Sequence, residues 1–212
     1  MQTLIKKLSL LIVTNFLLFG CASSYHPIAP QSLSYNSTYK LDDFKLRYEY
    51  NVLRNNKYKK KESKRGIHLV AVEFTNNSDH DVVFGKDVLL LSTSGAYLDP
   101  ISTQDAFVGL KQSVESYLLY LLLSFTTFDR TTTDSNGRTE SSSFPIGLII
   151  GPGIAGGNMI TAGNANAKFK SELEMYDIMN KTIHAGETKH GIVALRTNSY
   201  PSLTLKLAGD QE

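Results

Sequence analysis

Hydrophobic and polar positions alternate most regularly just after residue 43. Every second position there is apolar, and lysine, arginine, glutamate or asparagine stands between: the apolar positions are Phe44, Leu46, Tyr48, Tyr50 and Val52. Side chains of a strand point alternately to its two faces, so this pattern predicts a strand with one face in the core. Residues 67–74 are almost continuously apolar or β-branched, which predicts a strand covered on both faces.

Further short apolar runs follow these two strands, and turn residues separate them. They cover residues 82–84, 88–91, 191–195 and 203–207. About seven short strands at this spacing favour a mainly β fold, an antiparallel β-sandwich.

Residues 105–179 lie between the two groups of strands and have a helical pattern. Apolar residues recur three or four positions apart in the first part, as one face of a helix requires: Phe107, Leu110, Val114, Leu118, Leu121 and Phe125. Residues 129–143 are polar, and residues 144–167 contain six glycines and no charged residue. We therefore expect an apolar helical hairpin inserted into the sandwich.

Glycines of the second arm are spaced four residues apart. Gly147 and Gly151 form one such pair, and Gly153 and Gly157 form another. This spacing places small residues where a second helix can approach closely, so the four glycines are candidate helix-packing positions. The arms either pack on each other and on the sandwich or contact a membrane. Five charged residues within 129–143 weigh against a complete crossing.

The first 21 residues have the three parts of an export signal. Lys6 and Lys7 precede an apolar run, and Gly20-Cys21 ends it. About a dozen apolar residues are too few for a membrane span, which needs roughly 20. The sequence LFGC at 18–21 resembles the bacterial lipobox, with Phe19 where that class usually has a smaller residue.

This resemblance implies a secreted bacterial lipoprotein that is cut after Gly20 and carries lipid on Cys21. The membrane is then a partner through that lipid, since two or three acyl chains hold firmly where one chain binds reversibly. No aspartate follows Cys21 at the second position, where a retention signal for the inner membrane is often placed, which favours the outer membrane. Residues 22–40 lack periodicity and read as a tether.

Two segments of the body resemble the small immunoglobulin-like domains of bacterial envelope lipoproteins: AVEFTNNSDHDV at 71–82 and AGETKHGIVAL at 185–195. The resemblance implies an immunoglobulin-like β-sandwich and carries no activity with it. The expected organisation is a signal peptide at 1–20, the lipidated cysteine and tether at 21–43, strands at 44–104, the helical hairpin at 105–179, and the last strands at 180–212.

Composition excludes some functions. The chain is 42% hydrophobic and 20% charged, which is typical of a globular protein. Cleavage after Gly20 removes Lys6 and Lys7 and leaves equal numbers of basic and acidic residues. This balance gives no support to a nucleic-acid partner. A single cysteine excludes a disulfide within the chain.

Catalytic and cofactor motifs give no consistent signal. GPGIAG at 151–156 has the glycine spacing of a dinucleotide-binding loop, but fewer than 60 residues follow it, too few for the sheet such a loop needs. The histidines lack the spacing of metal ligands, and no GxSxG is present: they are His26, His68, His80, His184 and His190. We therefore expect no cofactor and no metal.

A run of basic residues at 57–65 includes Lys59, Lys60 and Lys61. We expect a solvated hairpin tip there, and contact with an anionic lipid surface is the alternative. Taken together, the sequence predicts a lipid-anchored envelope lipoprotein with a non-enzymatic binding or structural role and a candidate envelope protein partner. The alternatives are a membrane-inserting or oligomerising protein that uses the glycine-rich arm, and a hydrolase whose site a linear sequence does not reveal.

Overall fold

The computed structural model describes residues 21–98 and 100–209, so the predicted signal peptide lies outside the described residues. Strands and helices each take up about 32% of these residues, and the sheets are antiparallel. The fold is therefore mixed and sheet-rich, where the sequence predicted a mainly β fold.

The chain divides into two compact units. One, here called the sheet unit, contains Tyr25–Lys111 and Asn166–Glu212. The other, called the stem unit, contains Gln112–Ala165 together with the N-terminal residues up to Ser24. Helix α4 (Gly147–Met175) contributes residues to both units.

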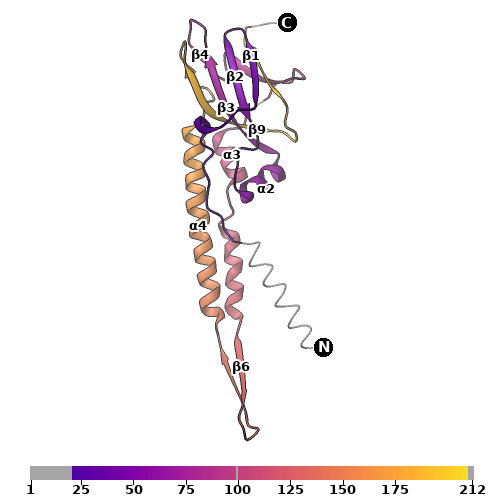
Figure 1. The fold of residues 1–212 in the computed structure, drawn as a ribbon, viewed down its shortest axis with the longest axis vertical. Helices are drawn as coiled ribbons and strands as arrows, with labels where there is room; N and C mark the ends of the chain where they lie inside the picture. Colours follow the sequence, from indigo (N-terminus) through magenta and orange to yellow (C-terminus); the bar gives the residue numbers. More distant parts are fainter. Residues whose placement is uncertain (1–20, 99, 210–212) are drawn as a thin grey trace. The chain divides into compact units, whose positions relative to one another are not determined.

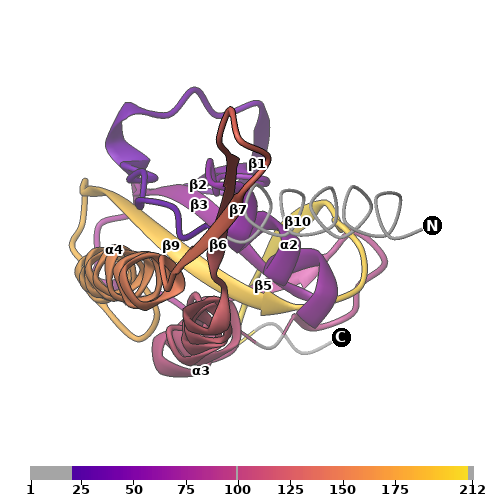
Figure 2. The same ribbon diagram turned by 90° about the horizontal axis from the view of Figure 1, so that it is seen from below.

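The sheet unit is built on a four-stranded antiparallel sheet with the order β1-β2-β3-β9, and Figure 2 shows β2, β3 and β9 side by side. These strands are β1 (Ser37–Leu41), β2 (Phe44–Glu49), β3 (Ile67–Asn76) and β9 (Thr188–Arg196). Two antiparallel pairs accompany the sheet: β5 (Val88–Ser92) with β10 (Leu203–Leu207), and β4 (Val82–Val83) with β8 (Thr182–Ile183).

The strand predicted at 67–74 is confirmed as β3, and the strand predicted at 44–52 is confirmed as β2 as far as Glu49, where it ends. Phe44, Leu46 and Tyr48 of β2 are buried, and the residues between them are less so, because successive side chains alternate between the two faces. Strand β3 lies between β2 and β9, and Ile67 to Val72 are all buried. Residues of these strands share one hydrophobic core with residues of β5 and β10.

Three further helices belong to the sheet unit: η1 (Pro30–Ser32), α2 (Asn56–Arg65) and α3 (Thr103–Leu110). Helix α2 corrects the hairpin tip predicted around Lys59, Lys60 and Lys61. Asn55 caps its start by accepting a hydrogen bond from the Lys57 backbone N–H at 2.8 Å. Gly66 ends the helix with a positive φ of 60°, which a residue with a Cβ rarely adopts.

Part of residues 21–43 packs on the folded chain, where the sequence predicted a tether. Strand β1 in this range pairs with β2 along its whole length. Tyr25, Ile28 and Tyr35 are buried, because the apolar side chains between the prolines and serines reach the folded chain.

The stem unit contains a 3₁₀ helix, a β-hairpin and the first part of α4. Helix η2 (Glu115–Phe125) leads into β6 (Phe128–Thr133) and β7 (Thr139–Phe144), and α4 follows. Figure 1 shows the segment before β6 running beside the start of α4.

The helical hairpin predicted at 105–179 is not evident. The polar tip forms a β-hairpin instead, because β-branched threonines stand at 131–133 and a turn sequence follows them. Asp134 accepts hydrogen bonds from the backbone N–H groups of Asn136 and Arg138 at 2.9 and 2.8 Å, and Gly137 has a φ of 75°. The first arm is divided into α3 and η2.

Candidate functional site

Cys21 is exposed, and the residues after it are attached to the stem unit. The Ala22 backbone N–H donates to Asn158 Oδ1 at 2.6 Å. Ser23 and Gln112 bond in both directions: Ser23 N–H donates to Gln112 Oε1 at 3.2 Å, and Gln112 Nε2 donates to Ser23 O at 2.7 Å. The position of Cys21 is thereby set by side chains of the stem unit.

Two tyrosines of η2 lie close to this attachment. Tyr117 donates a hydrogen bond to Gln112 Oε1 at 3.4 Å, and its ring stacks on that of Tyr120 with 6.4 Å between centroids. Burial raises the pKa of Tyr120, and the electrostatic influence of the nearby Cys21 raises it further. The cysteine is therefore surrounded by polar and aromatic groups of the stem unit.

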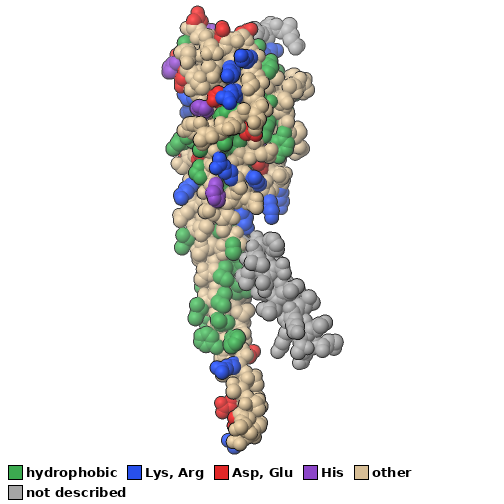
Figure 3. All heavy atoms as spheres, in the orientation of Figure 1, with side chains coloured by type: hydrophobic (Ala, Val, Ile, Leu, Met, Phe, Trp, Pro, Cys, Tyr) green, Lys and Arg blue, Asp and Glu red, His purple; other side chains and the backbone are tan. Residues whose placement is uncertain are grey.

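The remaining surface of the stem unit carries many exposed apolar side chains, here called the stem band. Their exposed fractions run from 38% to 85%, and Figure 3 shows hydrophobic side chains gathered along the stem above its charged end. The band consists of Leu118, Leu119, Leu121, Leu122, Phe125, Phe128, Phe144, Leu148, Ile149, Ile150 and Ile160. No charged residue occurs in 116–128 or in 144–167. Monomeric soluble proteins rarely expose an apolar surface this continuous.

The 3.0-residue period of η2 determines which of its residues join the band. Side chains three apart are eclipsed in a 3₁₀ helix. Tyr117 is buried and Tyr120 and Leu123 are partly buried, whereas the row of Leu119, Leu122 and Phe125 is exposed. One row thus packs within the unit, and the exposed rows form part of the band.

The structure separates the four candidate helix-packing glycines into two pairs. Gly147 and Gly151 are buried against η2: a Cβ on Gly151 would lie 2.9 Å from Ser124 N and 3.2 Å from Tyr120 O. A Cβ on Gly153 or Gly157 would meet no atom within 4 Å. Close backbone approach therefore occurs at Gly147 and Gly151 only, among these four.

The sequence of the stem part of α4 has a low propensity to form a helix in water. It contains six glycines and Pro152, which lacks the N–H that would bond to the Leu148 carbonyl. Relative to alanine these residues cost on the order of 8 kcal/mol in a solvated helix. Glycine and proline are commoner in helices that contact lipid. The composition therefore favours a helix that is stabilised by packing or by contact with lipid.

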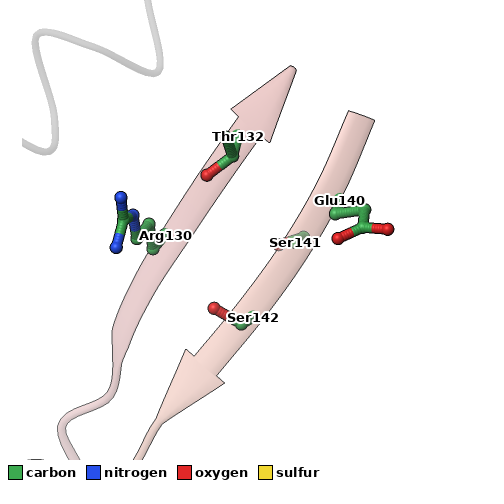
Figure 4. Close-up of a pocket in the computed structure, with 5 residues that line it drawn as sticks. All are labelled: Arg130, Thr132, Glu140, Ser141 and Ser142. Carbon is green, nitrogen blue, oxygen red and sulfur yellow. The ribbon is translucent and has the colours of Figure 1, made fainter. Parts of the chain in front are cut away.

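The β6–β7 hairpin offers no catalytic arrangement. A hollow of about 410 Å³ on this hairpin is an open strand face lined by Arg130, Thr132, Glu140, Ser141 and Ser142. Figure 4 shows Arg130 and Glu140 pointing away from each other, from the outer sides of β6 and β7. No acid and base converge there, and no nucleophile has a base beside it.

The sheet unit contains one buried acid beside a histidine. Glu62 is 3% exposed and accepts a hydrogen bond from the Leu69 backbone N–H at 2.9 Å. Burial raises the pKa of Glu62 to about 7. His68 is 4% exposed, its Nδ1 lies 3.9 Å from Glu62 Oε1, and burial lowers its pKa. A substrate does not reach groups this deeply buried, so the pair belongs to the core.

Glu172 holds the chain that follows the cysteine segment. Its carboxylate accepts hydrogen bonds from Tyr25 Oη and from the backbone N–H groups of Ile28 and Ala29, the latter two at 3.0 and 2.8 Å. The ring of Tyr25 packs on Phe169 with 5.3 Å between centroids. Sequence reasoning missed Glu172, Asn158 and Gln112, because their partners are distant in the chain.

The lysines of α2 differ in their contacts. Lys59 and Lys60 are exposed, whereas Lys61 Nζ donates a hydrogen bond to the Lys111 carbonyl. Among the described residues, no group of three histidine, cysteine or acidic side chains could hold a metal ion. Within the same part of the chain, no helix combines the length and hydropathy needed to cross a membrane.

Comparisons of the chain with models of known protein families, with curated proteins and with solved structures found no match.

Proposed function

We propose that this chain is a bacterial envelope lipoprotein, anchored to the outer membrane by lipid on Cys21, with a non-enzymatic binding or structural role. One observation carries the proposal: Cys21 is exposed, and Ala22 and Ser23 directly after it are hydrogen-bonded to the unit that carries the stem band. The sequence LFGC at 18–21, which resembles a lipobox, also supports the proposal. The lipid on Cys21 and the stem band would then act from the same unit of the protein.

The energy available from the stem band supports a role in binding. Fully burying a leucine, isoleucine or phenylalanine contributes about 1.5 to 3 kcal/mol. The side chains of the band are roughly half exposed or more, so covering the whole band is worth on the order of 10 kcal/mol. An interaction of this size is comparable to the total stability of a domain.

The sheet unit would serve as the scaffold, and we propose an immunoglobulin-like β-sandwich for it. The four-stranded sheet and the β5–β10 pair share one core, which is the arrangement of two packed antiparallel sheets. A hydrogen bond of 3.0 Å from the Leu203 backbone N–H to Tyr48 Oη joins β10 to β2. The fold by itself implies no particular activity.

Acyl labelling of the full-length precursor tests the anchoring. With labelled palmitate, the parent protein should take up label and fractionate with outer membranes, and Cys21→Ser should take up none. Ser23→Ala is the matched control, because the Ser23 side chain is not needed for either backbone bond to Gln112. Label in Cys21→Ser, or none in the parent, contradicts the proposal.

A further inference from the structure

We propose that the stem band is immersed in the hydrocarbon of the membrane leaflet that holds the lipid of Cys21. This inference rests on the lipid anchoring proposed above and names what covers the exposed apolar surface. The band and the cysteine belong to the same compact unit, so their relation is set by contacts within it. Acyl chains on Cys21 enter a hydrocarbon layer, and the band beside them meets that same layer.

Contacts with two elements of the stem unit fix the position of the cysteine. Ala22 is bonded to Asn158 of α4, the helix that also carries Leu148, Ile149, Ile150 and Ile160 of the band. Cys21 also lies near Tyr120 of η2, whose exposed residues Leu119 and Leu122 belong to the band. The lipid therefore leaves the protein from the unit whose helices η2 and α4 carry the band.

The distribution of apolar side chains favours lipid over a second protein. Leu148, Ile149 and Ile150 are consecutive residues of α4, and successive residues of an α-helix point about 100° apart. On η2, Leu118 and Leu121 are exposed in addition to the row of Leu119, Leu122 and Phe125. The band thus surrounds much of the stem unit, whereas a second copy covers one face. Hydrocarbon covers all sides, and the absence of charge in 116–128 and 144–167 leaves no ion to be desolvated.

The hairpin determines how the stem unit lies. Residues 129–143 carry five charged side chains, and both strands are exposed along their whole length. Charged groups are expensive in hydrocarbon, so this end stays at the level of the lipid head groups. The stem unit accordingly enters one leaflet and does not cross the bilayer.

Tryptophan fluorescence tests the inference directly, because the chain contains no tryptophan. Leu122→Trp and Ile149→Trp place single reporters on the band at side chains that are 65% and 68% exposed, so no packed contact is lost. Ser135→Trp, in the exposed turn between β6 and β7, is the matched control. The full-length lipidated proteins are reconstituted in phosphatidylethanolamine–phosphatidylglycerol vesicles, with or without brominated acyl chains.

We expect the Leu122→Trp and Ile149→Trp emission to be blue-shifted and to lose at least half its intensity in brominated vesicles. The Ser135→Trp emission should change little. Red-shifted, unquenched emission from both band reporters in vesicle-bound protein overturns the inference, since the band is then in water. Blue-shifted but unquenched emission also overturns it, because protein then covers the band, and cross-linking between copies identifies self-association.

Mass measurement of the N-terminal peptide from the same preparations separates this inference from the proposed function. A diacylglyceryl group on Cys21 together with unquenched band reporters contradicts immersion only. An unmodified Cys21 contradicts the lipoprotein proposal, and the inference fails with it.

Discussion

Replacing Gly151 by alanine should destabilise the stem unit, whereas the same change at Gly157 should stabilise it. Both glycines are inside α4, and alanine is favoured over glycine in a helix by about 1 kcal/mol. Gly157 has open space where the Cβ would lie, so this gain should appear in full. At Gly151 the added Cβ would lie 2.9 Å from Ser124 N, closer than ordinary van der Waals contact.

The contact at Gly151 involves backbone atoms of η2, which a rotamer change does not move. Overpacking of this kind costs about 1 to 3 kcal/mol, which offsets or exceeds the helical gain. The two variants should therefore differ by about 1 to 3 kcal/mol in the local stability of α4. Gly156→Ala, another position with no atom within 4 Å, should behave as Gly157→Ala does.

Hydrogen exchange of peptides from 147–165 measures this difference. A global melt is unsuitable because the chain has two compact units, and either can dominate a single transition. Faster exchange in Gly151→Ala and slower exchange in Gly157→Ala are expected. Equal protection in the two variants would show that α4 does not approach η2 as closely as the structure has it.

Three further outcomes concern the sheet unit, each measured by hydrogen exchange of peptides from that unit during denaturant titration, so that the stem unit does not contribute. Glu172→Ala leaves Tyr25 Oη and two backbone N–H groups without their acceptor and should cost about 2 to 4 kcal/mol, against little change for the exposed Glu174→Ala. Burial raises the pKa of Glu62 from 4.5 to about 7, so the folded protein keeps a proton that the unfolded chain loses as pH rises between these values. The free energy of unfolding of the parent then falls as pH rises over this range. Relative to the parent, the free energy of unfolding of Glu62→Gln should therefore rise by up to about 3 kcal/mol between pH 4.5 and 8. An unchanged difference across this range would show that Glu62 keeps its charge. Lys61→Ser should cost about 1 kcal/mol through its bond to the Lys111 carbonyl, and the exposed Lys60→Ser less than about 0.5. Equal effects at the two lysines would contradict that bond.

The strands could be predicted because their signal is local. Phe44, Leu46 and Tyr48 alternate with polar residues, and the same three side chains are buried in β2. Helix α2 was missed because only Tyr58 and Glu62 are buried among its ten residues, which leaves no apolar periodicity. Its boundaries did have a signal: Asn55 and Gly66 are typical helix caps, and they enclose the lysine run.

The sequence of the β6–β7 hairpin also contained a local signal for its structure, but the charged and polar residues around that signal obscured it. Thr131 to Thr133 favour a strand, and Asn136-Gly137 is a typical hairpin turn, but no apolar alternation accompanied them. The polar contacts of the candidate site could not be predicted at all. Glu172 and Ile28 are 144 residues apart, and Asn158 and Ala22 are 136 apart, so only folding brings each pair together.

Lipid and the stem band would reinforce each other under the proposed anchoring. One acyl chain gives only marginal membrane binding, and stable attachment needs a second contribution. Acyl chains on Cys21 would hold the band beside the bilayer, so that its insertion becomes an intramolecular step at high effective concentration. Once in hydrocarbon, the backbone hydrogen bonds of α4 no longer compete with water, and this lowers the penalty of its glycines. Residues 147–165 expose apolar side chains and have a low helix propensity, and both features are unfavourable in water. A location in hydrocarbon beside the lipid of Cys21 accounts for both.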